Sequence, residues 1–399
     1  MRLFTGATVI AEDEVLEDCD VAVEGDRIAA IGPKGSLRES GSESTDLSGC
    51  YLMPGLIDIH ADYIERMVAP RPTTIVDFDL ALRFAERELI AHGITTMYHS
   101  LSFYAGPEFV PSAVRKPEHT AGLIAVIGAA GGKEHIIRHR LHARFETDSV
   151  ARLDELKAYI AEGKVSLLSF MDHSPGQGQY RDIGILRKTL RGYNAKSDEE
   201  AELMMRESLA RPRLGPDELG ELSRFARDRG IAIASHDDDS PEKVAFAASL
   251  GSTISEFPIT METARAAKAA GMHAVAGAPN VVLGGSHSGN ISAAEAILDG
   301  SVDVLCSDYY PPALLNSVFV MAFRYALGLS AAVRLATLNP AAAVNADADY
   351  GSIAVGKKAD FIAVRLMADG FPAVALAVVD GESVFVSSYR REQNEKTVA

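Results

Sequence analysis

Residues 54–63 read PGLIDIHADY, a short apolar run that ends in polar side chains. His60 and Asp62 are two residues apart in this run, so both side chains point to the same side of an extended strand. A histidine and a carboxylate in this arrangement can bind one metal ion together, although a hydrogen-bonded strand end would use the same residues. The stretch predicts a strand whose carboxyl end carries metal ligands.

Downstream of this run, short apolar segments alternate with amphipathic segments of helical period, such as residues 79–91 and 216–229. This alternation is typical of βα units around a parallel sheet. We expect strands near residues 56–60, 94–99, 140–146, 165–171, 231–236, 253–256, 273–277 and 303–308. The sequence therefore predicts the α/β class, with a (β/α)8 TIM-like barrel over residues 54–345.

Both ends of the chain have a different pattern from the middle. Residues 1–53 contain short β-rich runs separated by Gly, Asp and Pro, and residues 346–390 return to such runs. We expect the two segments to form the first and second parts of one small β-sandwich. Residues 391–399 are polar and are expected to be a tail.

Length, charge and cysteine content limit the function. The 399 residues suit one barrel of about 250 residues plus an accessory domain. A net charge of −16 argues against binding to nucleic acid or an anionic membrane, but a local basic pocket could still bind an anionic substrate. Three cysteines without a CxxC pair, no apolar signal-peptide core and no membrane-length apolar run predict a cytoplasmic protein.

Polar residues also stand at the ends of the third and fourth expected strands. In RLHARFET, residues 140–147, alternation puts His142, Arg144 and Glu146 on one face. Glu146 could bridge two metal ions, and Arg144 could bind phosphate, unless the two only form a buried ion pair. In residues 166–180 an apolar strand ends in Asp172 and His173, of which we expect His173 to be the ligand.

The fifth and eighth expected strands end in the same way. IAIASHDDD, residues 231–239, places His236 at a strand end before three aspartates, which we expect to divide between helix capping and substrate contact. VDVLCSDYYPP, residues 302–312, places Asp308 at the last strand end, where it could act as ligand and general base.

These strand ends together predict a metal centre. Its expected ligands are His60, Asp62, Glu146, His173, His236 and Asp308. Imidazoles and carboxylates of this kind can hold one or two divalent ions. Such an ion lowers the pKa of a water molecule bound to it to about 7. We expect zinc, with manganese or iron as alternatives.

A separate segment, APNVVLGGSHSGN at residues 278–290, is rich in glycine and hydroxyl groups. Backbone N–H groups and polar side chains there could hold phosphate oxygens, although a plain glycine-rich loop would look the same. The expected substrate-binding residues are Arg144, Gly285, Ser286, His287, Ser288 and Asn290. The remaining histidines form no ligand pattern in the sequence and are expected to be structural or at the surface: His92, His99, His119, His135, His139 and His273.

With these residues in view, the chain resembles the amidohydrolase superfamily over nearly its whole length. The resemblance rests on PGLID before the first ligands, the late-strand histidines, the final-strand aspartate, LATLNPAAAV at 335–344 and GSIAVGKKADFIAV at 351–364. It implies a metal-dependent barrel flanked by a β-sandwich. The superfamily usually has His-x-His on the first strand, whereas this chain has His60-Ala61-Asp62.

More narrowly, four segments resemble the phosphonate-breakdown hydrolases of the carbon–phosphorus lyase pathway, at residues 60–72, 139–146, 169–180 and 279–290. That family also has His-x-Asp on its first strand. The resemblance implies hydrolysis of α-D-ribose 1-methylphosphonate 5-triphosphate to the 5-phosphate and pyrophosphate, with Asp308 accepting or steering the water proton. Tyr63 stands where that family would have asparagine.

Two other functions stay open at this point. The same centre could hydrolyse a C–N bond in a cyclic amide, an N-acyl compound or a deaminase substrate. A barrel that has lost its chemistry and serves only in binding is the second alternative. The expected partner is a small phosphorylated sugar rather than nucleic acid or membrane, and a homo-oligomer is compatible with the sequence.

Overall fold

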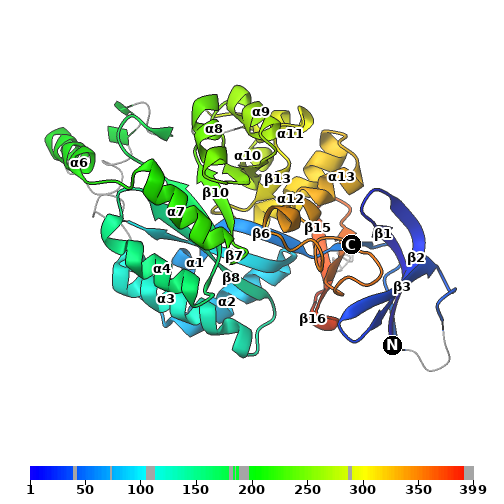
Figure 1. The fold of residues 1–399 in the computed structure, drawn as a ribbon. Coiled ribbons are helices and arrows are strands. Elements are labelled where there is room, and N and C mark those ends of the chain that lie inside the picture. Colours follow the sequence, from blue (N-terminus) through cyan, green and yellow to red (C-terminus); the bar gives the residue numbers. More distant parts are fainter. Residues whose placement is uncertain are drawn as a thin grey trace, which may run out of the picture.

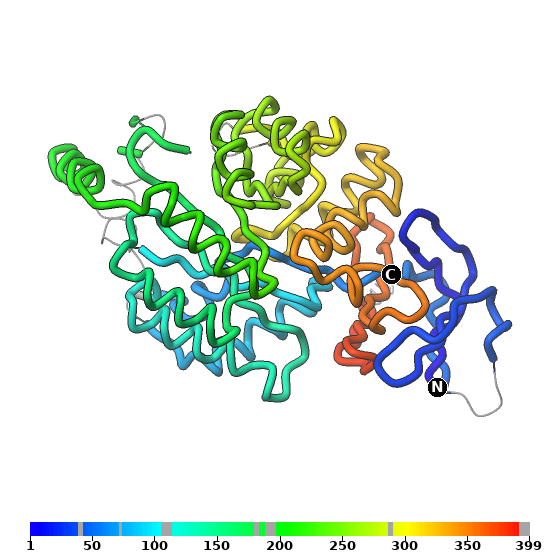
Figure 2. The backbone as a smooth tube through the Cα atoms, viewed as in Figure 1, coloured from blue at the N-terminus to red at the C-terminus, as the bar shows by residue number. Residues whose placement is uncertain are grey.

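The computed structural model describes residues 1–38, 43–71, 74–104, 113–178, 183–184, 186–187, 197–285 and 290–390. Two sheets organise this part of the chain (Figure 1). One sheet contains the strands of the middle of the chain and the other contains strands from both ends. Figure 2 follows the chain from the terminal sheet into the barrel and back.

The barrel sheet contains eight strands in sequence order. They are β6 (Leu56–Ala61), β7 (Ile94–Phe103), β8 (Arg138–Glu146), β9 (Val165–Met171), β10 (Ala232–His236), β11 (Ile254–Glu256), β12 (His273–Gly277) and β13 (Val304–Cys306). Every neighbouring pair is parallel. All ten residues of β7 are buried, as expected for a parallel strand covered on both faces. The predicted α/β barrel is confirmed, and each expected strand overlaps an observed one.

The barrel closes between its first and last strands at their carboxyl ends. The N–H of Asp308 donates to the carbonyl of His60 at 3.0 Å, and the N–H of Asp62 donates to the carbonyl of Asp308 at 3.1 Å. Ala61 and Asp308 thus form a parallel bridge. The closure brings three predicted site residues next to one another.

Helices surround the barrel strands, except the helix at residues 198–210, which lies apart from them at the left of the view (Figure 1). They are α1 (Tyr63–Val68), α2 (Phe78–Ala91), α3 (Pro117–Ala129), α4 (Leu153–Ala161), α6 (Asp198–Ala210), α7 (Pro216–Arg227), α8 (Pro241–Ser249), α9 (Met261–Ala269), α10 (Ala278–Leu283), α11 (Ala293–Leu298), α12 (Pro312–Phe319), α13 (Leu329–Arg334) and α14 (Leu338–Ala343). Short 3-10 turns cover Ala113–Arg115, Ala130–Gly132 and Val150–Arg152, and a π-helical turn covers Val320–Arg324.

The local sequence explains why α2 forms. The side chain of Asp77 accepts a hydrogen bond from the N–H of Leu80 and so caps the first turn. Its buried residues recur at helical spacing and pack toward the barrel: Ala81, Leu82, Ala85, Glu86, Leu89 and Ile90. Glu86 is the one charged residue on this buried face.

The terminal sheet has the order β16-β15-β14-β5-β1-β2-β3, with β4 beside β1. Its strands are β1 (Arg2–Ile10), β2 (Val15–Glu24), β3 (Arg27–Pro33), β4 (Glu43–Asp46), β5 (Tyr51–Pro54), β14 (Phe361–Leu366), β15 (Pro372–Val379) and β16 (Glu382–Val386).

One strand from each end of the chain meets at the centre of this sheet. β5 pairs antiparallel with β14, and Phe4 packs edge-on against Phe361 with ring centroids 4.9 Å apart. The expected joining of both termini in one β unit is therefore confirmed. The boundaries at residues 53, 345 and 390 stay predictions, and the polar tail at 391–399 lies outside the described residues.

A buried polar network connects the terminal sheet with the barrel. Asp360 is 5% exposed, forms an ion pair with Arg138 and accepts a hydrogen bond from Oγ1 of Thr95 at 2.7 Å. Its carbonyl accepts from the N–H of Gly55 at 3.0 Å. A side chain at position 55 would place its Cβ 2.2 Å from Oγ1 of Thr95, so this close approach requires glycine.

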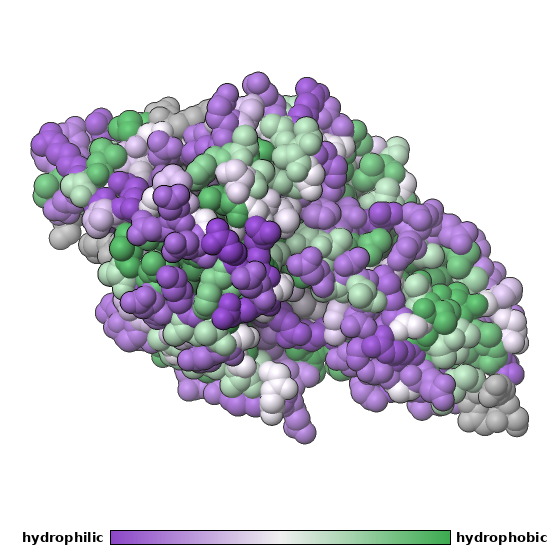
Figure 3. Space-filling view, in the orientation of Figure 1, coloured by the Kyte–Doolittle hydropathy of each residue, from purple (hydrophilic) through white to green (hydrophobic). Residues whose placement is uncertain are grey.

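On the face drawn in Figure 3, hydrophilic residues surround several smaller hydrophobic areas. Within the described residues, no helix has the length and apolar character needed to cross a membrane.

We predict that Asp360→Ala lowers the free energy of unfolding by about 3 kcal/mol, because the substitution removes the buried partner of Arg138 and leaves this guanidinium only the more exposed Asp380. Urea unfolding followed by circular dichroism measures this change. Asp13→Ala is the matched control, since the Asp13 side chain is 82% exposed in its ion pair with Arg334 and should contribute about 1 kcal/mol or less. Equal effects of the two substitutions would contradict the structural role of Asp360.

Candidate functional site

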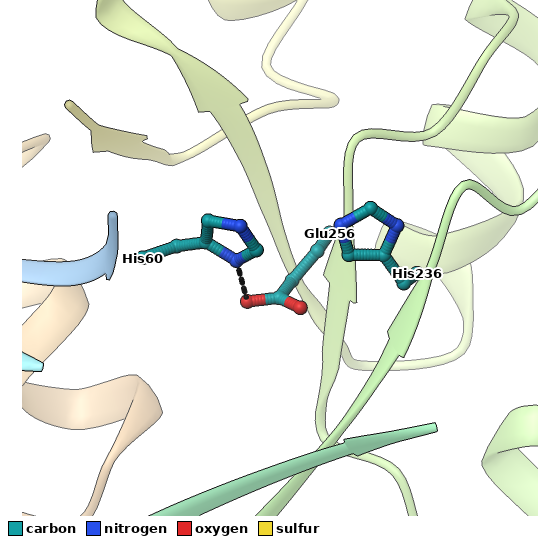
Figure 4. Close-up of side chains that lie close together, drawn as sticks. All are labelled: His60, His236 and Glu256. Carbon is teal, nitrogen blue, oxygen red and sulfur yellow. Dashed lines mark hydrogen bonds and ion pairs between the residues drawn. The ribbon is translucent and has the colours of Figure 1, made fainter. Parts of the chain in front are cut away.

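Three side chains from different barrel strands converge at the carboxyl ends of those strands (Figure 4). His60 is on β6, His236 ends β10 and Glu256 ends β11. Nδ1 of His60 lies 2.7 Å from Oε1 of Glu256, and one ligand atom from each of the three residues lies within 4.8 Å of the others. A single ion could therefore bind between them.

A second group of ligand atoms shares His236. Asp237 follows β10 directly, and its Oδ2 lies 3.1 Å from Nδ1 of His236 and 3.7 Å from Nε2 of His173. Glu146, at the end of β8, contacts Nδ1 of His173 and accepts a hydrogen bond from the His173 backbone N–H at 3.3 Å. The predicted ligands Glu146, His173 and His236 thus lie together.

The geometry of these groups suits a divalent cation. Nδ1 of His236, Oδ2 of Asp237 and Oε2 of Glu256 are buried and have no hydrogen-bond partner among the described residues. A tetrahedral zinc ion with ligands at 2.0–2.1 Å holds neighbouring ligand atoms about 3.3 Å apart. The distances of 3.1 and 3.7 Å around Asp237 fall on either side of that value.

Glu256 can support a metal ion in either of two ways. It can bind the ion directly, or it can accept the Nδ1 proton of His60 and so leave Nε2 of that ring available as a ligand. Burial lowers the pKa of His60 well below its usual value, which keeps the ring neutral and able to coordinate.

Asp308 lies at the closure of the barrel beside these groups. Burial raises the pKa of its carboxyl to about 7, and the negative charges of Asp62 and Asp237 act in the same direction. A Cβ at Gly277 would lie 3.4 Å from Oδ2 of Asp308, so glycine at the end of β12 leaves room beside this carboxylate. The assignment of Asp308 as a metal ligand and general base stays a prediction.

Three residues that follow barrel strands have left-handed backbone angles without being glycine. The φ values are 53° at Asp237, 56° at Phe257 and 59° at Asp308. Such conformations are uncommon and concentrate at functional sites. The ring of Phe257 packs against those of His60 and His236, at centroid distances of 4.9 and 5.2 Å, and so holds both imidazoles.

Positive charge stands next to the ligand groups. Arg144 on β8 is buried, and its guanidinium donates to Nε2 of His236 at 3.2 Å and to the sulfur of Met171 at 3.2 Å. Burial lowers the pKa of Arg144, but Tyr104 and Asp62 outweigh this effect and the net pKa is raised. A charged guanidinium at this place could bind a phosphate, as the sequence predicted.

Asp62 belongs to neither group of converging ligand atoms. Its carboxylate lies 3.4 Å from Arg115, whose Nε donates to Glu65 at 2.7 Å. The Asp62 side chain is 29% exposed. Its assignment as a ligand stays a prediction.

Sequence reasoning missed two members of the site. Glu256 ends a strand, as the chosen ligands do, and the same strand-end criterion could have identified it. Asp237 was assigned to capping or substrate contact along with Asp238 and Asp239. The capping expectation for these aspartates is wrong, because Ser240 caps α8 by accepting from the N–H of Lys243.

The predicted phosphate-binding segment is only partly described. Its first half is α10 rather than a loop, and this helix ends at Gly284 with φ 77°. Gly285 and Asn290 are described, whereas Ser286, His287 and Ser288 lie outside the described residues.

A cavity of about 240 Å³ lies beside His236, between β9, β10, α7 and α8. Its walls combine the apolar side chains Phe170 and Phe246 with the cations Arg213 and Lys243. The cavity offers a small, mostly apolar space next to His236, one of the predicted ligands.

A model of the Amidohydrolase family matches residues 51–386. The chain belongs to this family. This amidohydrolase is 36% identical over 325 residues to alpha-D-ribose 1-methylphosphonate 5-triphosphate diphosphatase of Escherichia coli (strain K12), an alignment that covers 80% of the chain and 84% of the relative. It is 37% identical over 101 residues to an adenine deaminase of Ruegeria sp. (strain TM1040), covering 24% and 15%. The predicted superfamily membership is confirmed.

Among solved structures, the amidohydrolase is similar to a Xaa-Pro dipeptidase with bound methionine in the active site. The TM-score is 0.65 at 15% sequence identity, with 97% of this chain and all of the other covered. At this identity the likeness supports the fold alone.

We predict that Glu256→Gln weakens binding of divalent metal by about 10- to 100-fold, because the amide neither accepts the His60 proton as strongly nor binds the ion as a carboxylate does. Equilibrium dialysis followed by elemental analysis measures the affinity. Glu262→Gln on the exposed side of α9 is the matched control and should bind metal as the wild type does. Unchanged affinity in Glu256→Gln would remove this residue from the site.

Proposed function

We propose that this amidohydrolase cleaves alpha-D-ribose 1-methylphosphonate 5-triphosphate to the 5-phosphate and pyrophosphate in phosphonate breakdown. The observation that carries the proposal is the 36% identity to the Escherichia coli diphosphatase over most of both chains. Four long segments that include Arg144, His173 and the residues around Gly285 resemble that family in the same order. The chain is then a hydrolase of a phosphorus anhydride.

The two groups of converging ligand atoms would bind the divalent ions that such a reaction needs. His60, His236 and Glu256 would hold one ion, and His173, Asp237 and Glu146 would hold or position another. When bound, the ions lower the pKa of a water molecule and neutralise negative charge on a phosphoryl group. We propose zinc, because three of the six ligands are imidazoles, with manganese or iron as alternatives that the three carboxylates would also suit.

A side chain of the protein then accepts the proton of the attacking water. Asp308 is a partly buried carboxylate whose pKa of about 7 would let it accept the proton of the attacking water near neutral pH. Asp62 remains a proposed ligand beside it. Attack at the phosphorus nearest ribose breaks the anhydride bond, and pyrophosphate leaves with the displaced oxygen.

The remaining phosphates of the substrate need donors outside the metal ligands. Arg144 lies at the ligand groups, and we propose that it binds the reacting phosphate. The segment with Gly285, Ser286, His287, Ser288 and Asn290 would hold the rest of the polyphosphate through backbone and side-chain donors.

We also propose a cytoplasmic location, supported by three cysteines that are free and buried within the described residues. The partner is a small phosphorylated sugar rather than nucleic acid or membrane. A homo-oligomer is compatible with the proposal.

Hydrolysis of a C–N bond is the competing function. The short similarity to an adenine deaminase favours it, but that alignment covers only 24% of this chain. A substrate panel of adenine, cyclic amides and N-acyl sugars separates the two functions, because turnover of a panel member above that of the triphosphate would favour the C–N activity.

We predict that metal-loaded protein converts the ribosyl triphosphate to equal amounts of the 5-phosphate and pyrophosphate. Phosphorus-31 NMR identifies both products directly. Removal of metal with a chelator should stop turnover, and zinc should restore it. Release of orthophosphate, or no turnover of the triphosphate, would contradict the proposed function.

We predict that Asp308→Asn lowers kcat by roughly 100- to 10,000-fold, because the amide cannot accept the proton. Steady-state kinetics on variants with matched metal content measures this loss. Asp299→Asn serves as control, because Asp299 pairs with Arg265 at the surface and should keep wild-type kcat. A kcat for Asp308→Asn within a factor of a few of wild type would exclude its role as base.

A further inference from the structure

A second cluster of metal-ligating side chains lies away from the candidate active site. Glu86 projects from α2, His135 precedes β8, and His139 is the second residue of β8. Glu146, in the candidate active site, is seven residues farther along the same strand, which corresponds to about 23 Å. The cluster is therefore too far away to share an ion with that site.

The three side chains meet at one carboxylate oxygen. Oε2 of Glu86 lies 2.9 Å from Nδ1 of His135 and 3.2 Å from Nε2 of His139. Exposure of the side chains is 5% for Glu86, 5% for His135 and 0% for His139. The distances of 2.9 and 3.2 Å are close to the spacing of about 3.3 Å that a tetrahedral zinc ion imposes, and all potential ligand atoms lie within 4.8 Å of one another.

The surroundings orient one of the imidazoles. Nε2 of His99, on β7, lies 2.9 Å from Nδ1 of His139, and the two rings stack. If Nδ1 of His139 donates its proton to His99, Nε2 carries a lone pair directed at the cluster, which is the arrangement found around metal-binding histidines. Burial lowers the pKa of His139 and of His99, so both rings are neutral. Coordination by His139 requires this neutral form.

We propose that Glu86, His135 and His139 form a zinc site that stabilises the packing of α2 against β7 and β8. Two imidazoles and one carboxylate match the ligand types of zinc, with the fourth position left to water. The site is separate from the proposed reaction. It also revises the expectation that His135 and His139 have no ligand pattern.

A bound ion would connect elements that are distant in the sequence. The helix supplies Glu86, the segment before β8 supplies His135, and β8 itself supplies His139. Metal binding at sites assembled only by folding contributes its free energy to stability. A hydrogen-bonded network without an ion, in which both rings donate to Glu86, is the alternative that the experiment must separate.

The first experiment leaves this cluster intact and disrupts the candidate active site. In His60→Gln/His173→Gln/His236→Gln protein, which lacks the imidazoles of both active-site ligand groups, added cobalt(II) should give the intense visible absorption of a four-coordinate ion, and zinc should compete with it. Adding Glu86→Gln to that background should abolish the absorption, whereas adding His92→Gln, at the end of the same helix, should not. No cobalt absorption in the His60→Gln/His173→Gln/His236→Gln protein, or absorption that persists with Glu86→Gln, would overturn the proposal.

The second experiment uses the wild-type protein and so does not depend on the folding of any variant. Crystals grown with zinc should show an anomalous difference peak within coordination distance of Glu86, His135 and His139. Absence of a peak there, with a peak at His236, would establish the hydrogen-bonded network instead. Neither readout depends on turnover, so failure of the proposed diphosphatase activity would leave this test unaffected.

Discussion

Two backbone hydrogen bonds at Asp308 join the last barrel strand to the first, and the active site depends on this closure. The bonds place His60, Asp62 and Asp308 side by side although they come from opposite ends of the barrel sequence. Once the ring of strands is complete, the carboxyl ends of β8 to β11 face the same interior space, and their terminal side chains have to meet there. Asp308 has a left-handed backbone with φ 59° at this closing bridge, a conformation that non-glycine residues rarely adopt and that concentrates at functional sites.

Charge explains why this space suits a cation and a phosphorylated substrate together. Glu146, Asp237, Glu256 and Asp308 are carboxylates in a largely buried region, and the pKa of Asp308 is raised by burial and by the negative charges of Asp62 and Asp237. An anionic phosphate would be repelled by these groups alone. Divalent ions held by these carboxylates would reverse the local charge, and Arg144 adds a permanent positive charge at the same place. The carboxylates and the arginine are thus complementary parts of one site for a metal and an anion.

The sequence predicted the barrel well because buried parallel strands appear as apolar runs and polar strand ends mark one face. His60, His173 and His236 followed from that rule, and the structure brings them together. Glu256 was missed because β11 has only three residues and no histidine stands beside it. The cluster of Glu86, His135 and His139 could not be predicted, since a helix residue and two residues near a strand start meet only through tertiary packing. Capping was misassigned because Ser240, rather than an aspartate, starts α8.

The pairing of β5 with β14 has a consequence for how the chain reaches its native state. β5 can pair with β14 only after almost the entire polypeptide has been synthesised, because β14 begins at Phe361. During that interval β5 presents an unpaired edge, which exposes the nascent protein to wrong partners and to chaperones. Completion of the terminal sheet is therefore a late event in biosynthesis. The sheet cannot form in full without β14, β15 and β16, the last strands of the chain to be made.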